Sequence, residues 1–251
     1  MLDRILKYKT KKNQAALWFL GQSGFVIKSA GVTVSIDPYL SDSVTEISPQ
    51  LKRIYPPPIE PSALKVDIYI ATHDHLDHLD PQTIAGYRHK NTTIFIGPRF
   101  VCEKYVVLGI RPQNIVRIDS GETKVVNNVQ LSGIYAIPND PEVIDTAGYK
   151  IVFTNGRSIY HTADTGFSPL LLQCAPSAET GLFCINGKWG NLNIEQAAEL
   201  AKKVNPKFAI GHHYDVMELN SENPHTFEYC MKHMNPKIIV KVLKVMEPFV
   251  W

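Results

Sequence analysis

Cysteine is scarce in this sequence, and long apolar runs are missing from it. The 251 residues include four cysteines, and no two of them form a CxxC pair. The opening segment MLDRILKYKTKK lacks the apolar core of a secretory signal, and no stretch is long enough to span a bilayer. We therefore expect reduced thiols, no membrane partner and a cytoplasmic location.

An excess of charge of one sign is also missing. The formal net charge is only +2, so we expect no nucleic-acid partner. The sequence carries neither standard glycine-rich phosphate loop and no Gly-x-Ser-x-Gly elbow, which argues against those nucleotide-binding folds and against serine hydrolases of the α/β type. Apolar residues make up 44% of the chain, as in ordinary globular proteins, so a sizeable core can form without disulfides.

What the sequence does contain is a dense group of histidines and aspartates directly after a predicted strand. Residues 66–71, VDIYIA, are β-branched, aromatic and short, which favours a largely buried strand. The following residues, THDHLDHLD, include His73 and His75. If the chain stays extended, side chains two residues apart point the same way, and these two imidazoles can converge on one ion.

The same loop continues with Asp77 and His78. Asp80 followed by Pro81 is typical of a helix start, so we predict a helix at 81–89 with Asp77 and His78 in the bend before it. One loop can therefore offer ligands to two adjacent ions. The alternative is a solvated loop that happens to be rich in histidine and aspartate.

The predicted elements follow the same order in both halves of the chain, a β-meander and then alternating strands and helices. The first half, to about residue 120, has predicted strands at 15–20, 25–28, 32–36, 66–71, 93–96 and 115–118, with helices at 81–89 and 100–108. The second half has strands at 123–126, 129–137, 149–153, 158–161, 182–185, 208–211 and 238–243, with helices at 169–172, 194–204 and 225–233. We expect one α/β domain, a four-layer αββα sandwich of two mixed β-sheets flanked by helices. Residues 41–65 are polar and proline-rich and predict a long surface excursion.

Two further strands are followed by residues of the same kinds. Asp164 follows the strand at 158–161, where a carboxylate either bridges two cations or only caps a short helix. His213 follows the strand at 208–211 as the second of two histidines, and it either binds metal or lies satisfied in the core. The histidines without suitable neighbours are predicted on the surface: His89, His225 and His233.

The order of these residues resembles that of a known superfamily. The pattern H-x-H-x-D-H at 73–78, with Asp37 before it and Asp164 and His213 after it, is similar to the metal-ligand series of the metallo-β-lactamase superfamily. The resemblance covers almost the whole chain and implies an αββα sandwich with a one- or two-metal site at the sheet edges. Shorter stretches resemble the L-ascorbate-6-phosphate lactonase branch, at 20–25, 185–187, 190–192, 213–215 and 220–224.

The resemblance implies a role for each matching residue. Asp37 matches an acid that orients the ligands. One match fails, because the family has another first-ion histidine where this chain reads IPNDPE at 137–142. Asp140 is the candidate oxygen ligand there, which would shift the metal preference from zinc towards manganese or magnesium; otherwise the first site is weak or empty. The implied ligand sets are His73 and His75 for a first ion, and Asp77, His78 and His213 for a second, with Asp164 bridging the two.

These ligands predict a metal-dependent hydrolase. An ion held by imidazoles and carboxylates lowers the pKa of a bound water to about 7, so a metal-bound hydroxide can attack at neutral pH. The predicted catalytic residues are Asp77, Asp74 and Asp37. Asp74 is a candidate to protonate the leaving alkoxide, or equally a surface residue.

The resemblance implies a small, phosphorylated sugar lactone or ester as substrate. The pocket residues implied are Asn186, Lys188, Asn191 and Tyr214, and Lys188 either pairs with a phosphate or is simply solvated. The segment 186–191 is shorter than in the lactonase branch, which leaves the substrate open. A phosphodiesterase of the same fold and a non-catalytic metal sensor are the alternatives. The branch also implies a homo-oligomer.

Overall fold

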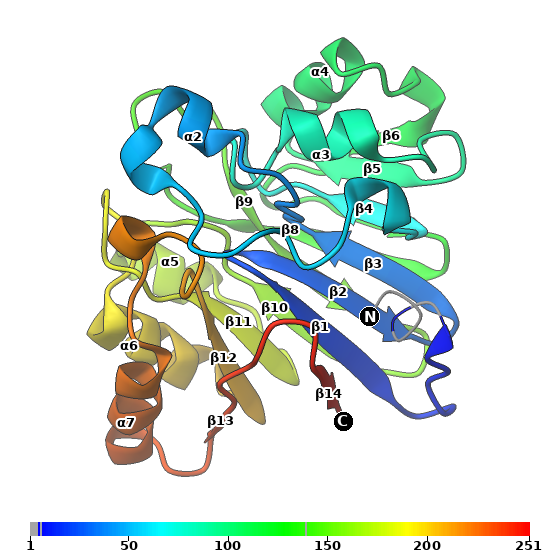
Figure 1. The fold of residues 1–251 in the computed structure, drawn as a ribbon. Coiled ribbons are helices and arrows are strands. Elements are labelled where there is room, and N and C mark those ends of the chain that lie inside the picture. The colour runs from blue at the N-terminus through cyan, green and yellow to red at the C-terminus, as the bar shows by residue number, and fades with distance from the viewer. Residues whose placement is uncertain (1–4, 6, 139) are drawn as a thin grey trace.

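The computed structural model describes residue 5, residues 7–138 and residues 140–251. Two seven-stranded β-sheets pack face to face, and helices cover their outer faces (Figure 1). This arrangement confirms the predicted four-layer αββα sandwich. No helix in the described residues is long and apolar enough to cross a membrane.

The first sheet combines the strands of the first half with the last strand of the chain. Its order is β14-β1-β2-β3-β4-β5-β6. The pairs among β14, β1, β2 and β3 are antiparallel, and those from β3 to β6 are parallel. The strands are β1 (Ala15–Gly21), β2 (Gly24–Ser29), β3 (Val32–Ile36), β4 (Ile68–Ile70), β5 (Ile94–Gly97), β6 (Ile115–Arg117) and β14 (Pro248–Val250).

The second sheet repeats this plan with order β13-β12-β11-β10-β9-β8-β7. Its pairs from β7 to β10 are antiparallel and those from β10 to β13 are parallel. The chain changes sheet between β6 and β7, close to residue 120, while the single-domain organisation stays a prediction. The strands are β7 (Thr123–Val126), β8 (Val129–Tyr135), β9 (Ala147–Val152), β10 (Ser158–His161), β11 (Thr180–Cys184), β12 (Phe208–His212) and β13 (Ile239–Val240).

The helices lie where the sequence predicts them, with one clear difference in length. The capping box that begins α6 joins the Asn193 and Gln196 side chains to each other's backbone N–H groups. The first predicted helix is shorter than expected, because Tyr87 leaves it in an extended conformation and its hydroxyl lies 2.5 Å from that of Thr93. The helices are α3 (Pro81–Gly86), α4 (Arg99–Val107), α5 (Pro169–Cys174), α6 (Ile194–Val204) and α7 (Pro224–Met234).

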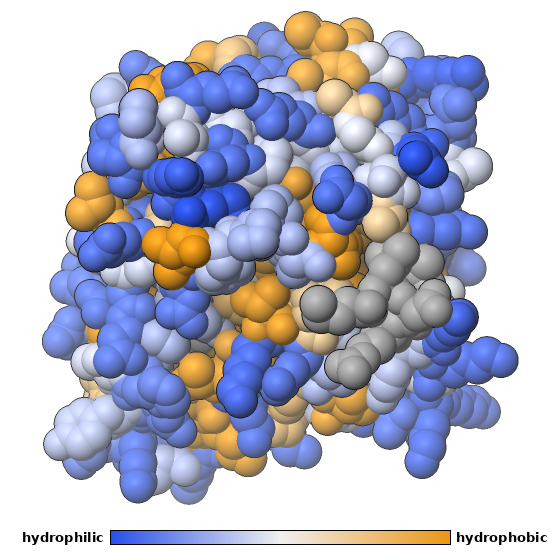
Figure 2. Space-filling view, in the orientation of Figure 1, coloured by the Kyte–Doolittle hydropathy of each residue, from blue (hydrophilic) through white to orange (hydrophobic). Residues whose placement is uncertain are grey.

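Apolar side chains fill the space between the sheets and the space under the helices. Phe25 and Ile27 of the first sheet belong to the same buried cluster as Tyr149 and Ile151 of the second. Hydrophilic side chains cover most of the face drawn in Figure 2, and the apolar ones gather in separate patches, one of them over α4. Side chains of both sheets therefore form one continuous apolar layer between them.

The excursion at 41–65 is more ordered than predicted. It contains α2 (Val44–Ile47) and two short 3₁₀ turns, at Pro49–Leu51 and Pro61–Ala63. The buried guanidinium of Arg53 donates to the carbonyls of Tyr39 and Tyr55, each at 3.1 Å. The backbone of Arg53 pairs with that of Met217, in the segment that follows β12. The excursion is thus attached to the loops at the strand ends.

Candidate active site

The predicted ligands meet at one edge of the sandwich. Asp37 directly follows β3, the loop at 73–78 follows β4, Asp164 follows β10 and His213 follows β12. β3 and β4 are parallel neighbours, and β10, β11 and β12 are parallel as well. The carboxyl ends of parallel strands meet at the same edge of a sheet, so residues far apart in sequence come together there.

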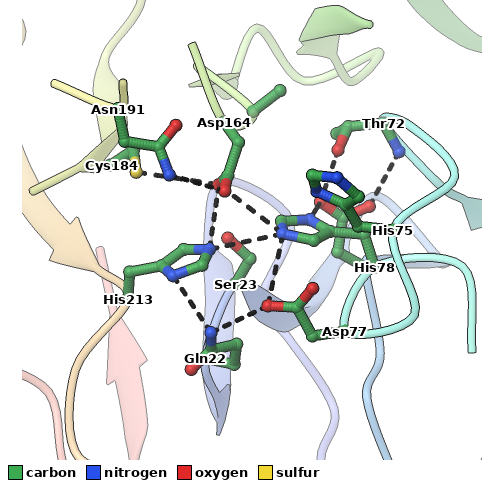
Figure 3. Close-up of polar contacts among 12 residues, drawn as sticks. Gln22, Ser23, Thr72, His75, Asp77, His78, Asp164, Cys184, Asn191 and His213 are labelled. Carbon is green, nitrogen blue, oxygen red and sulfur yellow. Dashed lines mark hydrogen bonds and ion pairs between the residues drawn. The ribbon is translucent and has the colours of Figure 1, made fainter. Parts of the chain in front are cut away.

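Asp164 is the centre of the tighter cluster (Figure 3). Its Oδ1 atom lies 2.9 Å from His213 Nε2 and 3.5 Å from His78 Nε2, and those two nitrogens are 3.3 Å apart. Asp77 Oδ2 lies 3.7 Å from His78 Nε2. These are the four residues predicted to hold the second ion, and the structure brings all of them together.

The residues predicted for the first ion lie beside this cluster. His73 Nε2 is 3.0 Å from His75 Nδ1, so the two imidazoles lie side by side, but bends and turns at 72–78 bring them together in place of the extended chain that the sequence analysis assumes. Asp140 Oδ2 lies 3.6 Å from His75 Nε2. The structure thus places Asp140 where an oxygen ligand of the first ion would be needed, although its role stays a prediction.

Asp37 holds the histidine loop from behind. Its fully buried carboxylate accepts hydrogen bonds from the Thr72 backbone N–H at 2.8 Å and from the Thr72 hydroxyl at 2.7 Å. It also lies 2.7 Å from His78 Nδ1. A carboxylate on Nδ1 fixes the orientation of the ring and leaves Nε2 free for an ion. This geometry supports the orienting role that the resemblance implies.

Burial and neighbouring groups set the protonation of the cluster. The pKa of His73 is lowered well below its usual value by burial and by the imidazole of His78. Burial also acts to lower the pKa of His78, but the surrounding carboxylates, led by Asp164, raise it well above its usual value. Burial acts to raise the pKa of Asp164, but the imidazoles of His213 and His78 outweigh it and hold that pKa well below its usual value. A negative charge on Asp164 is therefore available to a cation.

The donor atoms fit a divalent metal ion. Imidazole nitrogens and carboxylate oxygens are the ligands that zinc and manganese take in proteins. Within each group of candidate ligands, the donor atoms lie within 4.8 Å of one another. The groups overlap, as expected if neighbouring ions share ligands: His73, His78 and Asp164; Asp77, His78 and His213; and Asp164, Cys184, His212 and His213.

Gln22 is a site residue that the sequence analysis misses. Its side-chain amide donates to Asp77 Oδ2 at 2.8 Å and lies 3.0 Å from His213 Nδ1, so it links two predicted ligands (Figure 3). Gln22 adopts a positive φ of 56° in the tight turn between β1 and β2. The turn GQSG is visible in the sequence, but the contacts of its side chain are not.

Cys184 and His212 are also missed. The Cys184 thiol lies 3.6 Å from Asp164 Oδ1, at the end of β11. His212 is buried, and its Nδ1 atom lies 2.7 Å from the hydroxyl of Ser23. The signal for His212 is its position next to His213 at a strand end. Its ring stacks on that of His161, with the ring centroids 4.6 Å apart. Two further buried histidines therefore lie beneath the predicted ligands.

A cavity lies above Asp164, and only one of the four residues predicted to bind substrate lines it. Asn191 lines it and donates to Asp164 Oδ2 at 2.7 Å. Asn186 is buried nearby and donates to Asn220 Oδ1 at 2.6 Å. The Lys188 ammonium donates to the Ser221 carbonyl at 2.9 Å. The Tyr214 hydroxyl is buried and donates to the Leu243 carbonyl at 2.7 Å, which anchors the chain before β14.

Asp74, which is predicted as a proton donor, also lies away from the cavity. Its carboxylate lies 2.5 Å from the ammonium of Lys104 on α4, and its side chain is only 7% exposed. Asp74 therefore faces Lys104 and is not among the residues that line the cavity above Asp164. Of the three predicted catalytic aspartates, Asp77 lines the pocket and Asp37 lies behind the histidines. The structure thus favours Asp77 for proton transfer.

The cavity over the cluster has a volume of about 340 Å³. The excursion at 41–65 forms one wall, and the loops after β4, β8, β10, β11 and β12 form the rest. Its lining residues are Val44, Ile47, Ser48, Gln50, Leu51, His75, Leu76, Asp77, Asp140, Glu142, Asp164, Trp189, Asn191 and Asn220. Four of the predicted ligands therefore line a small pocket, namely His75, Asp77, Asp140 and Asp164.

Comparisons with known proteins agree with the superfamily that the sequence pattern resembles. A family model described as "Beta-lactamase superfamily domain" matches residues 33–214. A UPF0173 metal-dependent hydrolase of Staphylococcus saprophyticus is 27% identical over 222 residues, which cover 86% of this chain and 92% of the relative. A Salmonella choleraesuis protein named "Probable L-ascorbate-6-phosphate lactonase UlaG" is 22% identical over an alignment that covers 94% of this chain and 78% of that protein.

Solved structures share the fold. A metallo hydrolase of the archaeon Ignicoccus hospitalis superposes with a TM-score of 0.76 at 20% identity, covering 95% of this chain and 98% of its own. An isothiocyanate hydrolase from Delia radicum gut bacteria superposes with a TM-score of 0.73 at 16% identity, covering 93% of this chain and 98% of its own. At these identities the likeness concerns the architecture.

Proposed function

Because the chain belongs to the beta-lactamase superfamily domain family, we propose that this metal-dependent hydrolase cleaves small lactones or esters at the carbonyl carbon. The observation that carries the proposal is the convergence of the buried imidazoles of His78 and His213 on Asp164, which itself lines the pocket. A divalent ion there would make hydroxide available from water at neutral pH and polarise the carbonyl oxygen.

Other residues of this chain would orient the metal ligands and transfer protons. Asp37 orients His78, and Gln22 holds Asp77. Asn191 binds Asp164 Oδ2, which leaves Oδ1 directed at His78 and His213. We assign Asp77, whose carboxylate lines the pocket, to accept the proton of the attacking water and to return it to the departing alkoxide.

We propose one or two divalent ions per chain, zinc or manganese. Asp140 beside His75 adds an oxygen donor and favours manganese at the first position. Cys184 beside Asp164 adds a soft sulfur atom and favours zinc at the second. Competitive loading with the two metals, followed by elemental analysis, distinguishes these preferences.

Location, partners and oligomeric state also belong to the proposal. We propose a cytoplasmic protein with a small-molecule substrate and no nucleic-acid or membrane partner. All four cysteines are free in the structure, in keeping with reduced thiols. A homo-oligomer stays a prediction, which the mass of the protein in solution would test.

The proposed reaction predicts a definite order of substrates. After loading with zinc or manganese, we expect hydrolysis of simple sugar lactones and small esters, and little hydrolysis of phosphodiesters, because the proposed reaction is attack at a carbonyl carbon. The measurement is initial rates on a panel of lactones, lactone phosphates, esters and phosphodiesters, with chelated protein as the control.

The panel also separates the alternatives. Turnover of phosphodiesters with inert lactones and esters would select a phosphodiesterase and overturn the proposal. Tight metal binding without turnover of any compound would select the sensor.

A further inference from the structure

One wall of the pocket carries large apolar side chains. Ile47 and Leu51, from the excursion, line one side of the cavity, and Trp189 lines it from the loop after β11. Ile47 is 74% exposed and Trp189 is 54% exposed, so both side chains reach water at the pocket. Large apolar side chains gathered at a pocket mark a surface that an apolar part of a ligand can cover.

The excursion that carries this wall is firmly attached. Val44 and Tyr39 belong to a buried apolar cluster with Val216 and Met217, from the segment after β12. The Arg53 guanidinium lies 4.9 Å from the centre of the Tyr39 ring and donates to the backbone carbonyls of Tyr39 and Tyr55. The apolar wall is therefore held in place by packing and hydrogen bonds.

The charged side chains at the pocket are acidic. Asp140 and Glu142 line it beside the wall, and no lysine or arginine occurs among the described lining residues. Phosphate recognition in proteins normally uses arginine, lysine or a helix N-terminus. Lys188 is the cation that the resemblance implies for phosphate binding. Its ammonium donates a hydrogen bond to the Ser221 carbonyl, and the residue does not line the pocket. Arg53 is buried and bound to carbonyl groups.

We propose that the substrate is an uncharged lactone or ester that bears a short apolar group, seated against Ile47, Leu51 and Trp189, and that phosphorylated substrates are disfavoured. This inference rests on the proposed function, of which it names the substrate class. Glu142, the rim carboxylate that has no role as a metal ligand, adds repulsion against an anionic group, while the apolar wall adds affinity for alkyl or aryl carbon. A cavity of about 340 Å³ admits only a small molecule.

The size of the effect follows from the burial of carbon. Each buried methylene contributes about 0.8 kcal/mol, which corresponds to about a fourfold gain in kcat/KM. We expect this gain for the first two or three methylenes added to a γ-lactone, until the cavity is full. Trp189→Ala and Ile47→Ala each remove part of the wall and should flatten the dependence on chain length.

The experiment compares alkyl γ-lactones with matched lactones that end in a phosphate group. Wild type, Trp189→Ala and Ile47→Ala are assayed with Val107→Ala, which alters an exposed apolar side chain on α4 (85% exposed), away from the pocket. Calorimetric binding of the corresponding cyclic ketones, which cannot be hydrolysed, gives a second readout that needs no turnover.

The expected result is a steep dependence on alkyl length in wild type and Val107→Ala, a weaker one in the two pocket variants, and at least about tenfold poorer kcat/KM and binding for the phosphate series. Equal or better use of the phosphate series, or alkyl-ketone binding that the pocket variants leave unchanged, would overturn the inference. Absence of all hydrolysis would overturn the proposed function instead, and ketone binding would still decide the inference.

Discussion

Replacing Asp164 with asparagine is expected to lower kcat/KM by more than about 100-fold and to remove most of the bound metal. Changes to groups that merely support metal ligands typically cost 10- to 100-fold in affinity or activity, and Asp164 lies at the centre of the ligands themselves. Asparagine keeps the size and the contact with Asn191 but removes the negative charge that His78 and His213 face. The measurements are steady-state kinetics and metal content after identical loading.

The matched control is Glu199→Gln, which removes a carboxylate from an exposed position on α6. It should leave both rate and metal content unchanged. If Asp164→Asn keeps the metal and the rate of wild type, the cluster around Asp164 is not the catalytic centre.

Replacing Asp37 with alanine is expected to weaken metal binding by about 10- to 100-fold and to lower the free energy of unfolding of metal-free protein by at least about 2 kcal/mol. The substitution leaves the Thr72 N–H and hydroxyl without their buried acceptor and frees the His78 ring. Urea unfolding in the presence of chelator measures the stability term alone, and titration with zinc measures the other.

Asp37→Asn separates the two effects. Asp37 has a positive φ of 46°, which asparagine tolerates well, so this variant preserves the turn and one carbonyl acceptor. It should recover part of the unfolding free energy while metal binding stays weak, because an amide orients a histidine less strongly than a carboxylate does. Wild-type stability and affinity in Asp37→Ala would show that the carboxylate does not hold the loop.

Much of the site could be predicted because it depends on strand ends. His73, Asp164 and His213 each follow an apolar strand, and a local pattern of buried residues ending in a polar one is visible without a structure. Parallel pairing then brings these ends to one edge. The short strand β14 escapes prediction, since its three residues begin with proline and depend on pairing with β1, such as Phe249 opposite Leu17.

The parts that could not be predicted depend on contacts between distant segments. Gln22 bonds across 55 residues to Asp77, and no local pattern announces such a contact. Lys188 and Tyr214 have chemistry suited to a pocket, but backbone carbonyls of other loops take their donors. The excursion at 41–65 shows no strand or helix period, so its position against the segment after β12 comes from tertiary packing.

The most direct test of the metal-dependent account is the number of ions per chain. Wild type and His75→Ala are purified without chelator and analysed for metals before and after loading with zinc or manganese. The account predicts at least one ion in loaded wild type, held by Asp77, His78, Asp164 and His213. A second ion, at a first site that Asp140 completes, should be lost in His75→Ala. A wild-type chain that binds no ion under either condition would contradict it.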